Sequence, residues 1–94
     1  MNFKIWMKNL CLAHEVDLLD KITIISTQGN THSCNADFLI NKYYSILECM
    51  PEDQSYKKNS ITKQLKRGIS LQSILMSILR NQVDYVEEHK DMNT

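Results

Sequence analysis

Proline and glycine are scarce in this chain, which has one proline and two glycines among its 94 residues. Disordered segments are usually rich in these residues and poor in apolar ones. Here hydrophobic residues make up 43% of the chain, and no low-complexity stretch occurs. We therefore expect a folded chain, and its length predicts one domain, 1–94, with one small core.

The chain also lacks a predominant sign of charge and long apolar runs. Eleven basic residues balance eleven acidic ones, so the whole chain has no general attraction for nucleic acid or anionic lipid. Its apolar runs are far shorter than the roughly 20 residues that cross a bilayer. The first eight residues have the wrong order of charged and apolar side chains for a secretory signal. The composition argues against a membrane partner and disfavours nucleic acid.

The cysteines do not form the pattern of a disulfide framework. There are three, Cys11, Cys34 and Cys49, without CxxC spacing. Free thiols are typical of a reducing compartment, so we predict an intracellular location, in the cytoplasm or nucleus.

One set of residues has the composition of a zinc site. Cys11 and His14, followed by His32 and Cys34, supply two thiols and two imidazoles, enough for tetrahedral zinc. A whole strand is predicted between the two pairs, however, and neither pair has the usual knuckle spacing. We therefore expect no metal and no cofactor, and the four residues are the only candidate set.

Catalytic motifs are missing as well. Cys11 and His14 lie close enough on a helix to touch, but no third orienting group or oxyanion site accompanies them. Gly29 and Gly68 are isolated and form no phosphate-binding loop. The paired carboxylates Glu52–Asp53 and Glu87–Glu88 are interpreted as solvated charge. The sequence does not predict an enzyme.

The clearest local pattern lies between Lys21 and Pro51. Residues 21–27 are largely β-branched, residues 28–30 form a turn, and residues 31–34 return beside the first run, which predicts a hairpin. Ile22 and Ile24 should face the core, and the apolar Ile25 suggests that the opposite side is partly covered. From Ala36 the period changes to about 3.6, which predicts a helix that ends at Met50. Its apolar face comprises Phe38, Leu39, Tyr43, Ile46, Leu47 and Met50, with Asn35 as N-cap and Pro51 as terminator.

A leading amphipathic helix is predicted within residues 1–20, and it has two apolar stripes. One contains Phe3, Trp6, Met7, Leu10 and His14, and the other contains Ile5, Leu12, Val16 and Leu19. A short helix cannot cover both stripes on its own small domain, so it is either deeply buried or shared with another molecule. We predict that Trp6 lies at an intermolecular interface.

The second half of the chain predicts two further segments. Residues 51–68 are polar, and Ile61 and Leu65 favour one or two helical turns, with a short third strand as the alternative. A strong apolar stripe then predicts a helix from Leu71, capped by Ser70. This helix either continues to Glu88 or gives way to a short strand at residues 83–86, and residues 91–94 should fray.

The polar segment contains the only cluster of basic residues in the sequence, with Tyr56 beside it. The cluster comprises Lys57, Lys58, Lys63, Lys66 and Arg67. Clustered cations beside an aromatic ring are a modest signal for nucleic acid. Because the isoelectric point is near 6.8, we favour a solvated segment balanced by the acidic residues 84–91.

This order of helix, hairpin, helix and further helices resembles the BTB (POZ) domain of elongin C and the SKP-type cullin adaptors. Lys21–Ser26 stands at the family's first strand, Gly29 at its turn glycine, and Phe38–Met50 at its following helix. The resemblance implies a divergent, C-terminally short α+β domain with a leading helix at 1–20 and a BTB-like core at 21–90. Its function would be non-enzymatic protein–protein interaction.

Two uses of such a domain are implied. In a homodimer, the leading helix would supply the anchor through Phe3, Trp6, Met7 and Leu10. In an adaptor, a cullin or a receptor helix would contact Tyr44, Leu47, Met50 and Tyr56. The alternatives are a small inhibitory mimic that blocks a cellular partner, and a small nucleic-acid- or zinc-binding regulator.

Overall fold

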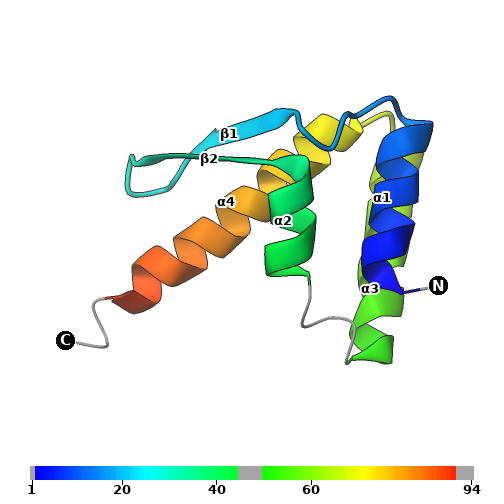
Figure 1. Ribbon diagram of the computed structural model, residues 1–94. Coiled ribbons are helices and arrows are strands. Elements are labelled where there is room, and N and C mark those ends of the chain that lie inside the picture. The colour runs from blue at the N-terminus through cyan, green and yellow to red at the C-terminus, as the bar shows by residue number, and fades with distance from the viewer. Residues whose placement is uncertain (1, 45–49, 91–94) are drawn as a thin grey trace.

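The computed structural model describes residues 2–44 and 50–90. Its elements are α1 (Phe3–Ala13), β1 (Lys21–Ile25), β2 (Thr31–Asn35), α2 (Ala36–Tyr43), α3 (Pro51–Lys66) and α4 (Leu71–Lys90) (Figure 1). In the described residues the strands form one antiparallel pair. This arrangement confirms the predicted α+β class. The predicted tail at 91–94 lies outside the described residues.

Helix α1 buries one of its two apolar stripes. The side-chain oxygen of Asn2 caps it by accepting a hydrogen bond from the Ile5 amide at 2.9 Å. Phe3, Met7 and Cys11, at spacings of four, are fully buried. The helix ends at Ala13, earlier than the predicted residue 20. The chain then reverses direction, and the amide of the buried Val16 donates to the Cys11 carbonyl at 2.8 Å.

The hairpin forms where the sequence predicts it, and its strands face as predicted. Ile24 pairs with His32 and Ile25 with Thr31, and the turn contains Gly29 at φ 87°. Ile22 and Ile24 are buried against α4, as predicted. The prediction that the opposite face of the hairpin is partly covered is wrong, because Ile25 is 61% exposed. Helix α4 packs under one face of this hairpin only (Figure 1).

Helix α2 begins where the sequence predicts, but it has a different buried face. The side chain of Asn35 accepts from the Phe38 amide at 2.7 Å, which confirms the N-cap. Leu39 and Ile40 are buried, whereas Phe38 is 51% exposed. Each residue turns by about 100°, so a face centred between Ala36 and Ile40 leaves Phe38 pointing outward. The prediction of an inward Phe38 is wrong.

The end of this helix also differs from the prediction. Helix α2 stops at Tyr43, and Met50 is the N-cap of α3. Pro51 therefore opens the next helix, where its missing amide has no cost. Ile46 and Leu47 of the predicted face lie outside the described residues.

Pro51–Lys66 form the continuous helix α3, whereas the sequence predicted one or two helical turns or a short strand in this segment. Glu52 and Asp53 in its first turn and Lys63 and Lys66 in its last turn complement the helix dipole, which favours a continuous helix. It ends before Gly68, which has a φ of 87°. A third strand is absent from the described residues.

Helix α4 continues to Lys90, so the alternative strand at residues 83–86 does not form. The Ser70 hydroxyl accepts from the Ser73 amide at 3.2 Å, which confirms the predicted cap. Val83 is buried because it extends the inward stripe of the helix by four residues beyond Leu79. Tyr85 and Val86, which a strand would have paired, are more than half exposed.

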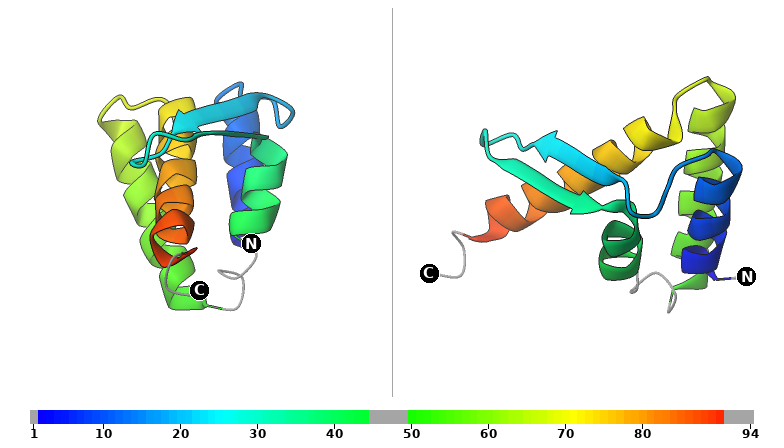
Figure 2. Two further views of the ribbon diagram at one scale, coloured as in Figure 1. Left: turned by 90° about the vertical axis from the view of Figure 1, so that its left-hand side faces the viewer. Right: turned by 45° about the horizontal axis from the view of Figure 1, so that its top comes forward.

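The core lies where α1, α2 and α4 meet beneath the hairpin. Phe3 of α1 and Tyr44 at the end of α2 pack ring to ring, with centroids 4.7 Å apart. Helix α3 packs against α4, and its Lys58 ammonium lies 5.9 Å from the centre of the Trp6 ring of α1. The C-terminal half of α4 extends away from this core under the hairpin (Figures 1 and 2).

Candidate functional surfaces

Three residues predicted to contact a partner belong to the core of the chain itself. Phe3 and Met7 have no exposed surface, and Tyr44 is 2% exposed. They belong to one buried hydrophobic cluster, in which the Phe3 ring packs on the Tyr44 ring, and they do not form an accessible anchor. Their assignment to an interface is therefore corrected. The physical reason is that the inward stripe of a short helix and a binding stripe have the same spacing in sequence.

The remaining predicted contacts lie on different parts of the surface. Trp6 and Leu10 are partly buried at the flank of α1, where the Trp6 ring lies 5.7 Å from Phe3 and 5.9 Å from the Lys58 ammonium. Met50 and Tyr56 are 44% and 74% exposed. Leu47 lies outside the described residues. The predicted adaptor surface is therefore reduced to these two exposed residues at the start of α3.

The outward side of α1 is the second apolar stripe of the sequence. Ile5 is 49% exposed and Leu12 is 80% exposed, and Leu19 in the following loop is 76% exposed. Side chains of this size are usually covered when they are close together. The sequence identified this stripe, but it could not show that this one, and not the Phe3 stripe, faces solvent.

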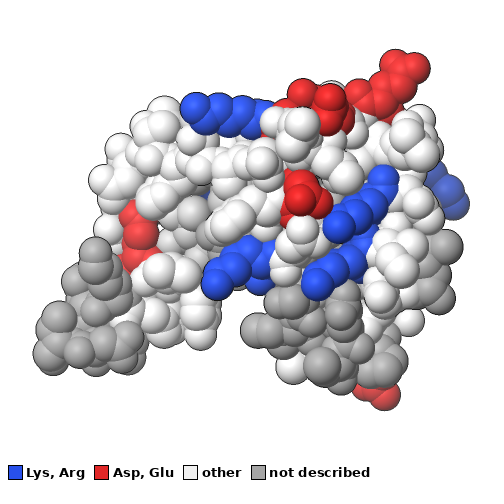
Figure 3. Space-filling view, in the orientation of Figure 1, with Lys and Arg blue, Asp and Glu red and all other residues white. Residues whose placement is uncertain are grey.

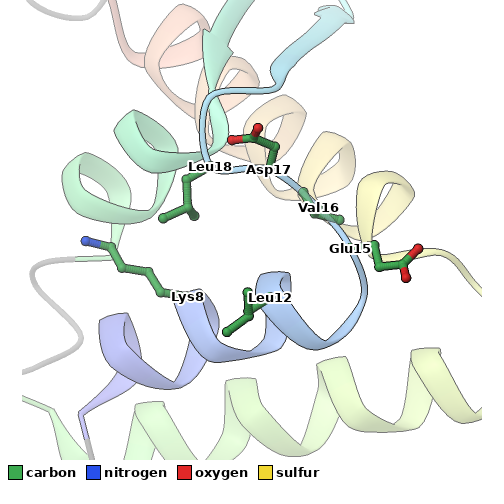
Figure 4. A pocket seen from close by; sticks show the side chains of 6 residues that line it. All are labelled: Lys8, Leu12, Glu15, Val16, Asp17 and Leu18. Carbon is green, nitrogen blue, oxygen red and sulfur yellow. The ribbon is translucent and has the colours of Figure 1, made fainter.

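Leu12 also lines a hollow between α1 and the loop that follows it. This groove has a volume of about 490 Å³ and is lined by Lys8, Leu12, Glu15, Val16, Asp17 and Leu18. Leu12 and Leu18 point into it, with Lys8 at one end and Glu15 at the other (Figure 4). We call these six residues the α1 groove.

Local backbone interactions build the loop wall of the α1 groove. Glu15 has a φ of 57°, which reverses the chain after α1. The Asp17 carboxylate accepts from the Leu19 amide at 2.9 Å, and the Asp17 amide donates to Asp20 at 3.2 Å. On the helix wall, the Lys8 ammonium lies 3.4 Å from Asp37 of α2. The side of the molecule with α1, α2 and the hairpin shows interspersed charges of both signs (Figure 3).

The four candidate zinc ligands are not brought together. Cys11 is buried in the core, His14 is exposed after α1, and His32 and Cys34 lie on the inner face of β2. Burial raises the pKa of both thiols, which disfavours the thiolate that zinc requires. Within residues 2–44 and 50–90, no group of three or more His, Cys, Asp or Glu residues could hold a metal ion.

A polar cluster joins the hairpin turn to the C-terminal half of α4. The Thr27 amide and hydroxyl donate to the Asp84 carboxylate at 2.8 and 2.7 Å. The Ser26 hydroxyl and the Asn30 amide group donate to Glu87 at 3.2 and 2.9 Å. We call these five residues the turn clasp. Its partners are 57 to 61 positions apart, so no local sequence signal could have found it.

The turn clasp changes the titration of its two carboxylates. The Thr27 amide, followed by its hydroxyl, lowers the pKa of Asp84. Hydrogen bonds from Ser26 and then Asn30 lower the pKa of Glu87. The Glu87 side chain is only 12% exposed, so the interpretation of this carboxylate as solvated charge is wrong.

Two further hollows lie on α3. One, of about 340 Å³, is lined by Tyr56, Asn59, Ser60, Lys63, Gln64 and Arg67. The other, of about 200 Å³, lies between α3 and α4 and is lined by Lys57, Ser60, Ile61, Gln64, Ile74, Ser77, Ile78 and Asn81. None of these described lining residues has a carboxylate.

Comparison with protein families, with curated proteins and with solved structures finds no match to this chain. In the described part of the chain, no helix has the length and apolar character that crossing a membrane requires.

Proposed function

We propose that this chain is a non-enzymatic protein–protein interaction module that self-associates through the outward side of α1. The observation behind this proposal is the exposure of Leu12, at 80%, beside the α1 groove, with Ile5 and Leu19 also exposed. The outward side of α1 replaces Phe3 and Met7 as the contact surface.

The charges of the α1 groove suit a second copy of the same chain. A two-fold interface brings the same patch of both copies together, so each end of the patch must complement the other end. The α1 groove has Lys8 at one end and Glu15 at the other, with Leu12 on its helix wall and Asp17 on its loop wall between them. Two copies packed in opposite directions would place the basic end of one groove against the acidic end of the other.

The resemblance to the BTB domain is part of this proposal. It rests on the order of a leading helix, a hairpin and a helix that directly follows the hairpin. We place the module inside the cell, where the unpaired thiols of Cys11 and Cys34 would stay reduced.

The test is the mass of the purified chain in solution, measured by light scattering over a wide concentration range. We expect a monomer–dimer equilibrium that Leu12→Ser weakens. Burying a leucine contributes at least about 1.5 kcal/mol, and a two-fold interface contains two copies of it. The loss is therefore about 3 kcal/mol, or a roughly 100-fold higher dissociation constant.

The matched control is Val86→Ser, which removes an apolar side chain that is 57% exposed on α4. This variant should leave the dissociation constant unchanged. A chain that stays monomeric at every concentration would contradict self-association. Equal weakening by both substitutions would show that the outward side of α1 is not the contact surface.

A further inference from the structure

The neutral net charge of the chain conceals a strong separation of charge along it. Residues 54–83 contain no Asp or Glu, and their cations are Lys57, Lys58, Lys63, Lys66, Arg67 and Arg80. All eleven acidic residues lie outside this stretch, so it has a formal charge of +6 while the rest has −6. The near-neutral isoelectric point averages over this separation, so it does not exclude a local surface that binds nucleic acid.

The fold brings the two helices of this acid-free stretch into contact. Residues 54–83 comprise most of α3 and the first part of α4, which pack together. The two hollows on α3 share Ser60 and Gln64 in their linings, so they are neighbours on this helix. We call the residues that line the two hollows the α3 face.

The helix geometry spaces the polar groups of the α3 face regularly. Lys63 and Arg67 are four residues apart, or about 6 Å along the helix axis, and Tyr56 precedes Lys63 by about 10 Å. The Tyr56 ring is 74% exposed. Asn59, Gln64 and their neighbours in the lining add neutral hydrogen-bonding groups between the cations and the ring.

The helix dipole does not account for the whole pattern. It favours cations in the last turn of α3, where Lys63 and Lys66 lie. It does not explain Lys57 near the middle of that helix, or a first half of α4 without a single carboxylate.

The chemistry of the α3 face favours a nucleic acid over a protein partner. Protein interfaces have an apolar centre, whereas nucleic-acid interfaces are more polar and much more positive. Among the described lining residues, Tyr56 is the one exposed large apolar side chain, since Ile61, Ile74 and Ile78 are buried. An exposed ring beside cations is the arrangement that stacks an unpaired base.

We propose that the α3 face binds single-stranded nucleic acid. Lys57, Lys63 and Arg67 contact successive phosphates, and a base stacks on Tyr56. This site shares no lining residue with the α1 groove, so the proposal of nucleic-acid binding does not depend on self-association.

The test uses fluorescence anisotropy with mixed-sequence single-stranded RNA and DNA of about 12 nucleotides, within the usual site size. The affinity is measured from about 50 to 200 mM salt. We expect Lys63→Gln/Arg67→Gln to weaken binding and to flatten the slope of log affinity against log salt by about 1.4, since each lost phosphate contact contributes about 0.7. Tyr56→Ala should weaken binding roughly tenfold or more without changing the slope.

The control is Lys21→Gln/Lys42→Gln, which removes the same charge from β1 and α2 and should preserve the salt slope. The melting temperature of each variant shows whether the fold survives. Failure of the native chain to bind at the lowest salt overturns the proposal, and so does an equal effect of the two double variants. A poly-glutamate peptide that competes equally well, together with an unaffected Tyr56→Ala variant, would assign the α3 face to an acidic protein segment instead.

Discussion

Removing the hydroxyl of Tyr44 should stabilise the protein. The Tyr44 side chain is 2% exposed, and its hydroxyl has no hydrogen-bond partner within the described part of the chain. Burial raises the pKa of this phenol, because the charged form would be desolvated. An unsatisfied hydroxyl in the core costs about 1 to 3 kcal/mol, whereas the ring keeps its packing against Phe3 in Tyr44→Phe.

We expect Tyr44→Phe to raise the free energy of unfolding by about 1 to 2 kcal/mol, measured by urea denaturation. For a chain of this size, each kcal/mol corresponds to about 4 to 8 °C in melting temperature. The control is Tyr85→Phe, whose ring is 60% exposed and stacks on His89 with centroids 4.0 Å apart. Its effect should stay within about 0.5 kcal/mol.

A destabilised Tyr44→Phe variant would refute this reasoning, since it would mean that the hydroxyl has a partner in the folded chain. Unchanged stability together with weaker association would have a different meaning. It would indicate that Tyr44 contacts a partner, as the sequence predicted.

Two further predictions concern the ends of elements. Asn35→Ala should lower the free energy of unfolding by about 1 kcal/mol, because the Phe38 amide loses its acceptor at the start of α2; a stability equal to that of the native chain would show that the cap contributes nothing. Asp84→Asn tests the turn clasp by pH. The lowered pKa of Asp84 means that its ionised form stabilises the fold. That stabilisation is complete above the ordinary carboxyl pKa and is lost as the pH falls below about 4. Melting temperatures should therefore fall less steeply with acid in the variant, and parallel curves would contradict a role for Asp84.

The features that the sequence predicted correctly depend on neighbouring residues. The alternation of Ile22 and Ile24, the Asn35 cap and the inward stripe of α4 each lie within one element. Period and capping are local physical properties, so they can be recognised without the rest of the fold.

Helix α3 was harder to predict because it buries little of its surface. Ile61 is buried and Leu65 is partly buried, while most of the helix is polar and exposed. Its continuity depends on charges at both ends and on packing against α4, which a search for apolar periods does not detect.

The candidate surfaces depended on contacts between distant residues. Both stripes of α1 are apolar, and Tyr44 and Asp37, from the following helix, contact one side of α1 and leave Leu12 outside. The α1 groove and the turn clasp could therefore not be assigned until the fold placed those contacts. The cations and the ring of the α3 face were evident in the sequence, but the continuous helix that aligns them was not predicted.

The turn clasp joins two segments of the chain that the ribosome makes at different times. The hairpin leaves the ribosome before α4, and a two-stranded hairpin is marginal in water on its own. Its partners Asp84 and Glu87 are synthesised about 60 residues later, which takes roughly 3 to 12 seconds at ordinary translation rates. During that interval Ile22 and Ile24 have no α4 to cover them. A nascent chain of this protein should thus expose an apolar β-hairpin to chaperones for seconds, and should bury it only when α4 emerges.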